Sequence, residues 1–140
     1  MKELLIEKIQ KLLRKFQLQT ANPEPEVEKD ALRQKAKSVL PAQLAKLAAT
    51  HGFNYSKVTV RKSRSRWGSC SSKKSINLSL YLMLLPEHLI DYVLLHELCH
   101  TIHLNHSPAF WDLLNKCTEG KAKELRREIR RYRRLQIQQA

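Results

Sequence analysis

The stretch HELCHTIHLNH, residues 96–106, combines a helical pattern with four closely spaced histidines. Residues four apart lie on the same face of a helix, so His96 and His100 can each direct one ring nitrogen toward a common point. Glu97 lies about 100° round the helix from His96, too far round to be a natural ligand on that face. It can still reach a water molecule held there. This spacing is typical of a hydrolytic zinc site carried by a helix.

Two residues compete to be the third ligand, because a catalytic zinc ion usually has three protein ligands and one open position. His103 would share the face of His96 if the helix continued, but it would lie about 10.5 Å further along the axis. Three rings spread over that length cannot all reach to about 2 Å from one ion. We expect the helix to end near Asn105, in a left-handed conformation, so that the chain turns back. The sequence therefore favours one Zn²⁺ ion held by His96, His100 and His106.

The same stretch predicts how such a site would work. Zinc would lower the pKa of a bound water toward about 7, and Glu97 would take its proton and pass it to the leaving group. The competing interpretation is an ordinary amphipathic helix whose histidines face solvent. Three histidines at ligand-compatible spacing together with a glutamate are harder to explain in that way. The pattern therefore predicts a metal-dependent hydrolase.

The segments before this helix predict helices followed by a short sheet. Apolar spacing predicts a helix over residues 2–17, and two prolines predict a linker over 20–26. A charged helix follows over 27–40, and Pro41 either ends it or starts the next helix, which stops at Gly52. Alternating residues then predict strands over 57–64 and 75–81, joined by RSRWGSCSSKK (64–74).

Helices dominate the rest of the chain. Pro86 is expected at the start of a helix that runs to about Ile102, and Ser107-Pro108 predicts a capped helix over 108–117. Gly120 is expected to separate the helix over 108–117 from a last helix over 121–136. The order predicts an α+β fold with a short antiparallel sheet packed against the histidine-bearing helix. We expect residues 1–140 to form one domain, with an N-terminal helix and linker over 1–26 and the core and basic C-terminal helix over 27–140.

The chain is strongly basic, with a net charge of +13 over 140 residues. Such a charge favours nucleic acid or other polyanionic partners, although a solvated basic surface would look the same. Arg64 and Arg66 lie close in sequence to the expected cleft and, with Lys73, could hold the phosphates of a nucleotide. The last helix carries further lysines and arginines that could follow a phosphate backbone.

Three cysteines without a close pair argue for free thiols in a reducing compartment. The apolar stretch from Leu78 to Leu104 is interrupted by charged residues and should not cross a membrane. A cytoplasmic protein is the expectation.

Cys70 is not expected to be a ligand or nucleophile, because three histidines are available. Tyr81 and Tyr92 are possible oxyanion donors, but core packing is the favoured role for both.

The segments RSRWGSCSSKKSINLSLYLMLLPEHLIDYVLLHELCH (64–100) and HELCHTIHLNHSPAFW (96–111) resemble the YgjP-like metallopeptidase domain family. More distantly, they resemble SprT-like and other zincin domains. The resemblance runs from about Leu32 to Leu114 and implies a zincin-like α+β fold. It also implies zinc ligands at His96, His100 and His106, and a catalytic glutamate at Glu97. Some relatives are described as nucleotide phosphohydrolases, so the resemblance implies hydrolysis more firmly than it implies a substrate.

Three functions are compatible with these patterns. The favoured one is a zinc-dependent metallopeptidase that acts on peptides. The second is a metal-dependent phosphohydrolase of nucleotides. The third is a basic nucleic-acid-binding module with a structural zinc, which is disfavoured because a closed site needs four ligands and three good ones are visible.

Overall fold

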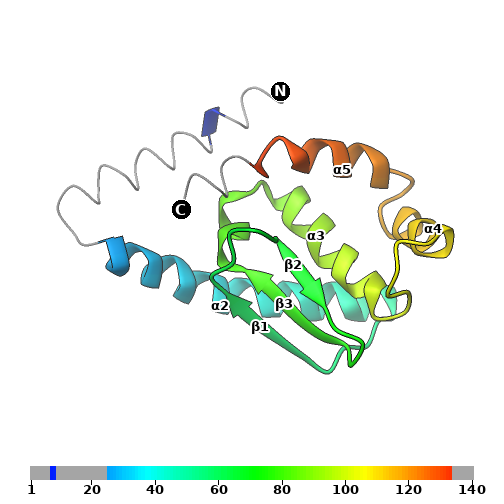
Figure 1. Cartoon of the computed structure of the whole chain (residues 1–140), viewed down its shortest axis with the longest axis horizontal. Coiled ribbons are helices and arrows are strands. Elements are labelled where there is room, and N and C mark those ends of the chain that lie inside the picture. Colours follow the sequence, from blue (N-terminus) through cyan, green and yellow to red (C-terminus); the bar gives the residue numbers. More distant parts are fainter. Residues whose placement is uncertain (1–6, 9–24, 134–140) are drawn as a thin grey trace.

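The chain folds into helices packed against a small three-stranded sheet (Figure 1). The computed structural model describes residues 7, 8 and 25–133. This architecture confirms the predicted α+β class. The elements in chain order are α2 (Pro25–His51), β1 (Lys57–Arg61), β2 (Gly68–Cys70), β3 (Ser75–Ser79), the 3₁₀ helix η1 (Leu80–Leu84), α3 (Glu87–His100), α4 (Pro108–Cys117) and α5 (Ala122–Arg130).

The sheet is mixed, with strand order β1-β3-β2. The two predicted strands correspond to β1 and β3, which pair parallel, so the expectation of an antiparallel sheet is wrong for this pair. The antiparallel partner of β3 is β2, which was not predicted as a strand. The prediction failed because the short strand β2 lies inside residues 64–74, which were predicted to be a connection. It reverses the chain once more, and β3 therefore runs in the same direction as β1 (Figure 1). The expected second strand also ends early, at Ser79, where η1 begins.

Helix α2 covers the core with a stripe of four buried residues spaced four apart: Ala36, Leu40, Leu44 and Ala48. It packs against β1, η1 and α3. Pro41 lies inside this helix, so the predicted break there is wrong. Proline removes one helical hydrogen bond at a cost of about 3 kcal/mol. Buried leucines on both sides of Pro41 keep the helix continuous, which shows tertiary packing overriding a local signal.

The ends of the chain were predicted less well than its middle. α2 begins at Pro25, inside the predicted linker and before the expected start at residue 27. The predicted N-terminal helix over 2–17 and the rest of the linker lie outside the described residues, apart from Glu7 and Lys8, which are helical. The last three residues of the predicted helix 121–136 lie outside them as well. None of the helices in the described part of the chain is long and apolar enough to cross a membrane.

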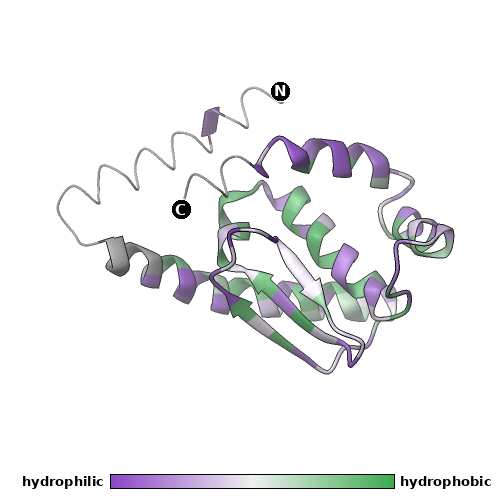
Figure 2. Cartoon of the chain, viewed as in Figure 1, coloured by the Kyte–Doolittle hydropathy of each residue, from purple (hydrophilic) through white to green (hydrophobic). Residues whose placement is uncertain are grey.

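Helix α3 is the centre of the fold and packs against α2, β2, α4 and α5. Figure 2 shows hydrophobic residues along much of α3, whereas α5 is mostly hydrophilic. Most residues in the second half of α3 are buried, including the polar residues Glu97 and His100. A polar group buried in an apolar helix is costly unless it is paired or used, so these side chains mark where chemistry is placed.

Candidate metal centre and adjoining pocket

Three histidine rings converge on one point. The Nε2 atoms of His96, His100 and His106 lie 3.2 Å from one another in all three pairs. Nitrogens bound tetrahedrally to zinc at 2.0–2.1 Å would lie about 3.3–3.4 Å apart. In the described residues, these histidines form the one group of three or more potential ligand side chains that could hold a metal ion. The triangle therefore has nearly the dimensions that a zinc ion requires.

A hydrogen bond between His100 and the backbone determines which nitrogen of its ring carries the proton. Its Nδ1 atom lies 3.0 Å from the carbonyl oxygen of His103, which can only accept a hydrogen bond. The ring proton therefore sits on Nδ1, and Nε2 presents a lone pair to the other two rings. A backbone carbonyl that orients a histidine in this way is common around bound metals. This donor set fits a cation.

His106 reaches the site because α3 ends at His100, two residues before the predicted end at about Ile102. The amide of His103 donates back to the carbonyl of Cys99 at 2.9 Å, which closes the last turn. Asn105 does not adopt the expected left-handed conformation; among residues 25–133, Lys74 and Glu119 are the non-glycine residues with positive φ. The turn instead ends at Ser107, whose side chain accepts a hydrogen bond from the amide of Phe110 and starts α4.

Two aromatic residues at the start of α4 hold the rings in place. Phe110 is fully buried and stacks on His100, with ring centroids 4.4 Å apart. The centroids of His96 and His106 each lie 5.0 Å from that of Phe110, in edge-on contact. Trp111 stacks on His106 at 5.9 Å. Phe110 therefore contacts all three histidine rings.

Burial keeps His96 and His100 neutral. It lowers the pKa of His96 to about 3, and the other two rings and the Arg126 guanidinium act in the same direction. The pKa of His100 is also lowered by burial, although its backbone hydrogen bond opposes this. A neutral imidazole keeps the lone pair with which it binds a metal, so these residues are in the ligating state at neutral pH.

Glu97 is buried beside the sheet and faces Gly68 on β2. It is 5% exposed, and burial raises the pKa of its carboxyl to about 8, while Arg66 lowers it in part. A Cβ atom at Gly68 would lie only 3.1 Å from the Glu97 Oε2 atom. A cation at the histidines would act in the same direction as Arg66 and favour the ionised carboxylate.

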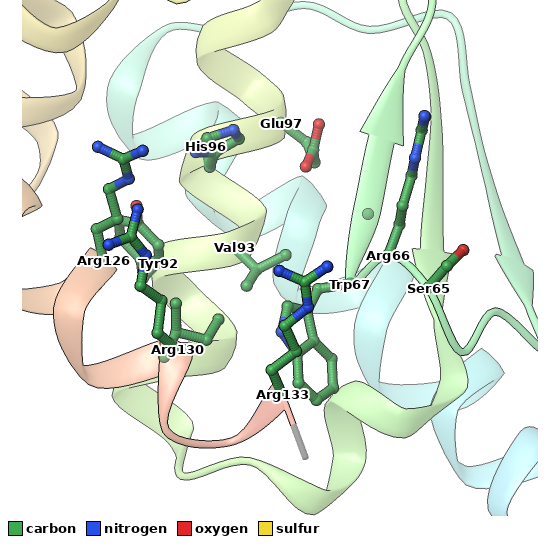
Figure 3. Close-up of a pocket in the computed structure, with 12 residues that line it drawn as sticks. Ser65, Arg66, Trp67, Tyr92, Val93, His96, Glu97, Arg126, Arg130 and Arg133 are labelled. Carbon is green, nitrogen blue, oxygen red and sulfur yellow. The ribbon is translucent and has the colours of Figure 1, made fainter. Parts of the chain in front are cut away.

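His96 and Glu97 open into a pocket of about 370 Å³ between α3, α5 and β2 (Figure 3). Its walls combine aromatic and aliphatic residues with arginines. The lining residues are Ser65, Arg66, Trp67, Gly68, Tyr92, Val93, His96, Glu97, Arg126, Ile129, Arg130 and Arg133. The pocket therefore joins the histidines and the buried carboxylate to a basic rim.

The structure separates the three residues predicted to hold phosphates. Arg66 lines the pocket beside Glu97, but Arg64 lines a second, open cavity between α2 and β1, together with Arg33 and Lys37. Lys73 is exposed in the turn between β2 and β3, where its carbonyl accepts a hydrogen bond from the Ser56 hydroxyl. These three side chains do not share one cavity.

The two tyrosines considered as oxyanion donors have different positions. Tyr81 is 1% exposed in η1 and does not line the pocket, and its hydroxyl has no hydrogen-bond partner within residues 25–133. Tyr92 lines the pocket, with its ring centroid 6.0 Å from that of His96. Burial raises the pKa of Tyr92 to about 12, so its hydroxyl stays protonated and can donate a hydrogen bond.

The arginines on the α5 side were missed as site residues. Arg126, Arg130 and Arg133 were read as part of a general basic helix, yet they line the same pocket as His96. Their spacing of four and three residues, beside the partly or fully buried stripe at Ala122, Leu125, Ile129 and Tyr132, was the available signal. The sequence alone did not show that this helix packs over α3.

The family model described as YgjP-like, metallopeptidase domain, matches residues 2–132, so the chain belongs to this metallopeptidase family. The chain is also similar to the crystal structure of the metallopeptidase zymogen of Pyrococcus abyssi abylysin. The two are 27% identical, with a TM-score of 0.58, over 65% of this chain and 91% of that chain. No curated protein matches this chain.

Proposed function

We propose that this member of the YgjP-like metallopeptidase family hydrolyses peptide bonds with one zinc ion held by His96, His100 and His106. The observation that supports this most is the triangle of Nε2 atoms at 3.2 Å, with the lone pair of His100 directed inward. Zinc bound there would acidify a water molecule and polarise the substrate carbonyl. Three protein ligands leave a position open, as a catalytic site requires.

Glu97 is the proposed general base. Its carboxylate lines the same pocket as His96, and Gly68, which has no side chain, leaves space for it against β2. In this role Glu97 accepts the proton of the attacking water and then gives it to the leaving amine. The Tyr92 hydroxyl, which is protonated and belongs to a residue lining the same pocket, is the proposed donor of a hydrogen bond to the substrate carbonyl.

Metal analysis combined with a peptidase assay tests the proposal. The purified chain is expected to bind one zinc ion and to cleave casein or unstructured peptides, and a chelator should abolish the cleavage. Glu97→Gln should keep the zinc and lose cleavage by about 100-fold or more. His106→Ala should lose both. His103→Ala is the matched control, because it keeps the carbonyl that orients His100, and it should retain both.

The same preparations distinguish the nucleotide alternative. Phosphate release from nucleoside triphosphates that requires zinc and Glu97, without any peptide cleavage, would replace the peptidase proposal. The separation of Arg64, Arg66 and Lys73 speaks against a common phosphate site built from them. Stoichiometric zinc without either activity would leave a structural metal site and contradict both hydrolase functions.

A further inference from the structure

The pocket beside the candidate metal centre has a row of arginines along one side. Arg126 and Arg130 belong to α5, and Arg133 follows it with the spacing of the same helical face. Figure 3 shows these three side chains on one side of the pocket and Arg66 on the other, with His96 and Glu97 on α3 between them. The pocket is therefore bordered by guanidinium groups from two separate elements.

Within the described part of the chain, no ion pair balances the positive charge of this row. Among residues 30–133, the ion pair that forms joins His88 to Glu128 at 2.8 Å, and it involves none of the three α5-side arginines. Arg126 instead lies over the Trp111 ring, 5.1 Å from its centroid. Of the residues that line the pocket, four are arginines and Glu97 is the one acid. A concave site with an excess of one charge attracts ligands of the opposite charge.

The spacing of the row indicates the shape of the ligand. On a helix, side chains four apart lie about 6 Å from each other, and those seven apart about 10.5 Å along the axis. In an extended peptide, alternate side chains on one face lie about 7 Å apart. Between the arginines, Trp67, Val93 and Ile129 supply an apolar surface for the methylene groups of a side chain. Arginine also matches the planar carboxylate with two parallel hydrogen bonds.

We propose that this pocket binds acidic side chains of a peptide substrate next to the bond that is cleaved. The inference rests on the proposed peptidase function and adds the class of substrate. Arg130 and Arg133, together with Arg126, are the specificity-determining residues. A peptide that carries glutamates at alternate positions would engage more than one of these guanidinium groups at once, whereas the same peptide with glutamines would engage none by charge.

Peptide binding to the zinc-loaded Glu97→Gln protein tests this without cleavage. The probes are a fluorescein-labelled peptide with glutamates at alternate positions, its glutamine counterpart, and the glutamate peptide with an amidated C-terminus. Measured by anisotropy at 0.15 M salt, the glutamate peptide should bind about tenfold or more tightly than the glutamine peptide. Amidation should change little, because side chains and not the terminal carboxylate are recognised. Equal binding of the glutamate and glutamine peptides would overturn the inference, and so would loss of binding on amidation.

Charge-matched variants separate the pocket from the general basicity of the chain. Arg130→Gln/Arg133→Gln removes two lining arginines, and Arg127→Gln/Arg131→Gln removes two exposed arginines nearby that do not line the pocket. The first pair should weaken binding of the glutamate peptide about tenfold, and the second pair less than about twofold. Equal weakening by both pairs would overturn the inference. So would binding of a nucleoside triphosphate, and not of the peptide, that depends on Arg130 and Arg133.

Cleavage by the wild-type chain distinguishes this inference from the function on which it rests. Faster cleavage of the glutamate peptide supports both. Equal cleavage of the glutamate and glutamine peptides overturns the inference and leaves the peptidase proposal standing. If the zinc-loaded chain cleaves no peptide, the peptidase proposal fails, while peptide binding that depends on Arg130 and Arg133 still supports the acidic preference of the pocket.

Discussion

The side chain of Glu97, the proposed base, packs against β2 at Gly68, where the lack of a side chain leaves space for it. A Cβ atom at position 68 would lie 3.0 Å from Glu97 Cγ and 3.2 Å from the carbonyl oxygen of Asn77 on the neighbouring strand. Such distances force a neighbour to move, and the carboxylate can move more easily than the paired strand backbone. The close approach of β2 to α3 therefore limits where the Glu97 carboxylate can lie.

Gly68→Ala should accordingly damage catalysis more than metal binding. Because the new methyl group displaces the Glu97 carboxylate, we expect kcat/KM for peptide cleavage to fall by about 100-fold. The zinc content should stay at that of the wild type, since no histidine is touched. Ser69→Ala, the next residue of the same strand, is the control and should keep most of the activity. A Gly68→Ala enzyme with wild-type kinetics would show that this contact does not position Glu97.

Phe110 and the histidines lead to a second prediction. Replacing the fully buried Phe110 by leucine removes the ring contacts to all three histidines but keeps an apolar side chain. The zinc affinity should fall about tenfold, because the rings are less well oriented before the metal binds. Competition with a chromophoric chelator measures this.

Leu114→Ala provides the comparison for Phe110→Leu. Leu114 is also fully buried in α4 but forms no part of the ring cluster. Its truncation should cost about 2–5 kcal/mol of unfolding free energy and leave zinc affinity nearly unchanged. If both variants lose zinc affinity equally, the effect of Phe110 comes from general stability and not from ring orientation.

The sequence predicted the local parts of this site and missed the parts that depend on packing. Helical geometry alone brings His96 and His100 together, and the structure groups His106 with them while His103 is not in that group. Arg126, Arg130 and Arg133 were not assigned to the pocket, because their positions depend on how α5 crosses α3. The parallel pairing of β1 with β3 was missed since a three-residue strand has too short a pattern to recognise. The ligand and base assignments, and the division of the chain at residue 26, stay predictions.

Pro41 gives a third prediction, which concerns stability. Pro41→Ala restores the amide that can donate to the carbonyl of Lys37 and relieves the steric conflict of a proline inside a helix. After subtracting the extra freedom gained by the unfolded chain, the free energy of unfolding should rise by about 2 kcal/mol. Ala45→Pro, at an exposed position of the same helix, should lower it by about 3 kcal/mol. Chemical denaturation with urea measures both. A destabilised Pro41→Ala variant would mean that the proline is needed for the path of α2.

Cys70 gives a fourth prediction, which depends on pH. Burial, reinforced by the Glu97 carboxylate, raises the pKa of this partly exposed thiol from an ordinary value of 9.0 to about 11. The thiolate is the reactive form, so at pH 8 its population should be about 100-fold lower in the folded chain than in the unfolded chain. Labelling with iodoacetamide should therefore be slow in the folded chain, increase with pH until about pH 11, and accelerate in guanidinium chloride at constant pH. Peptide mapping by mass spectrometry distinguishes Cys70 from the buried Cys99. Fast labelling of Cys70 at pH 7 in the folded chain would contradict this, and would reopen the role of nucleophile that the sequence argued against.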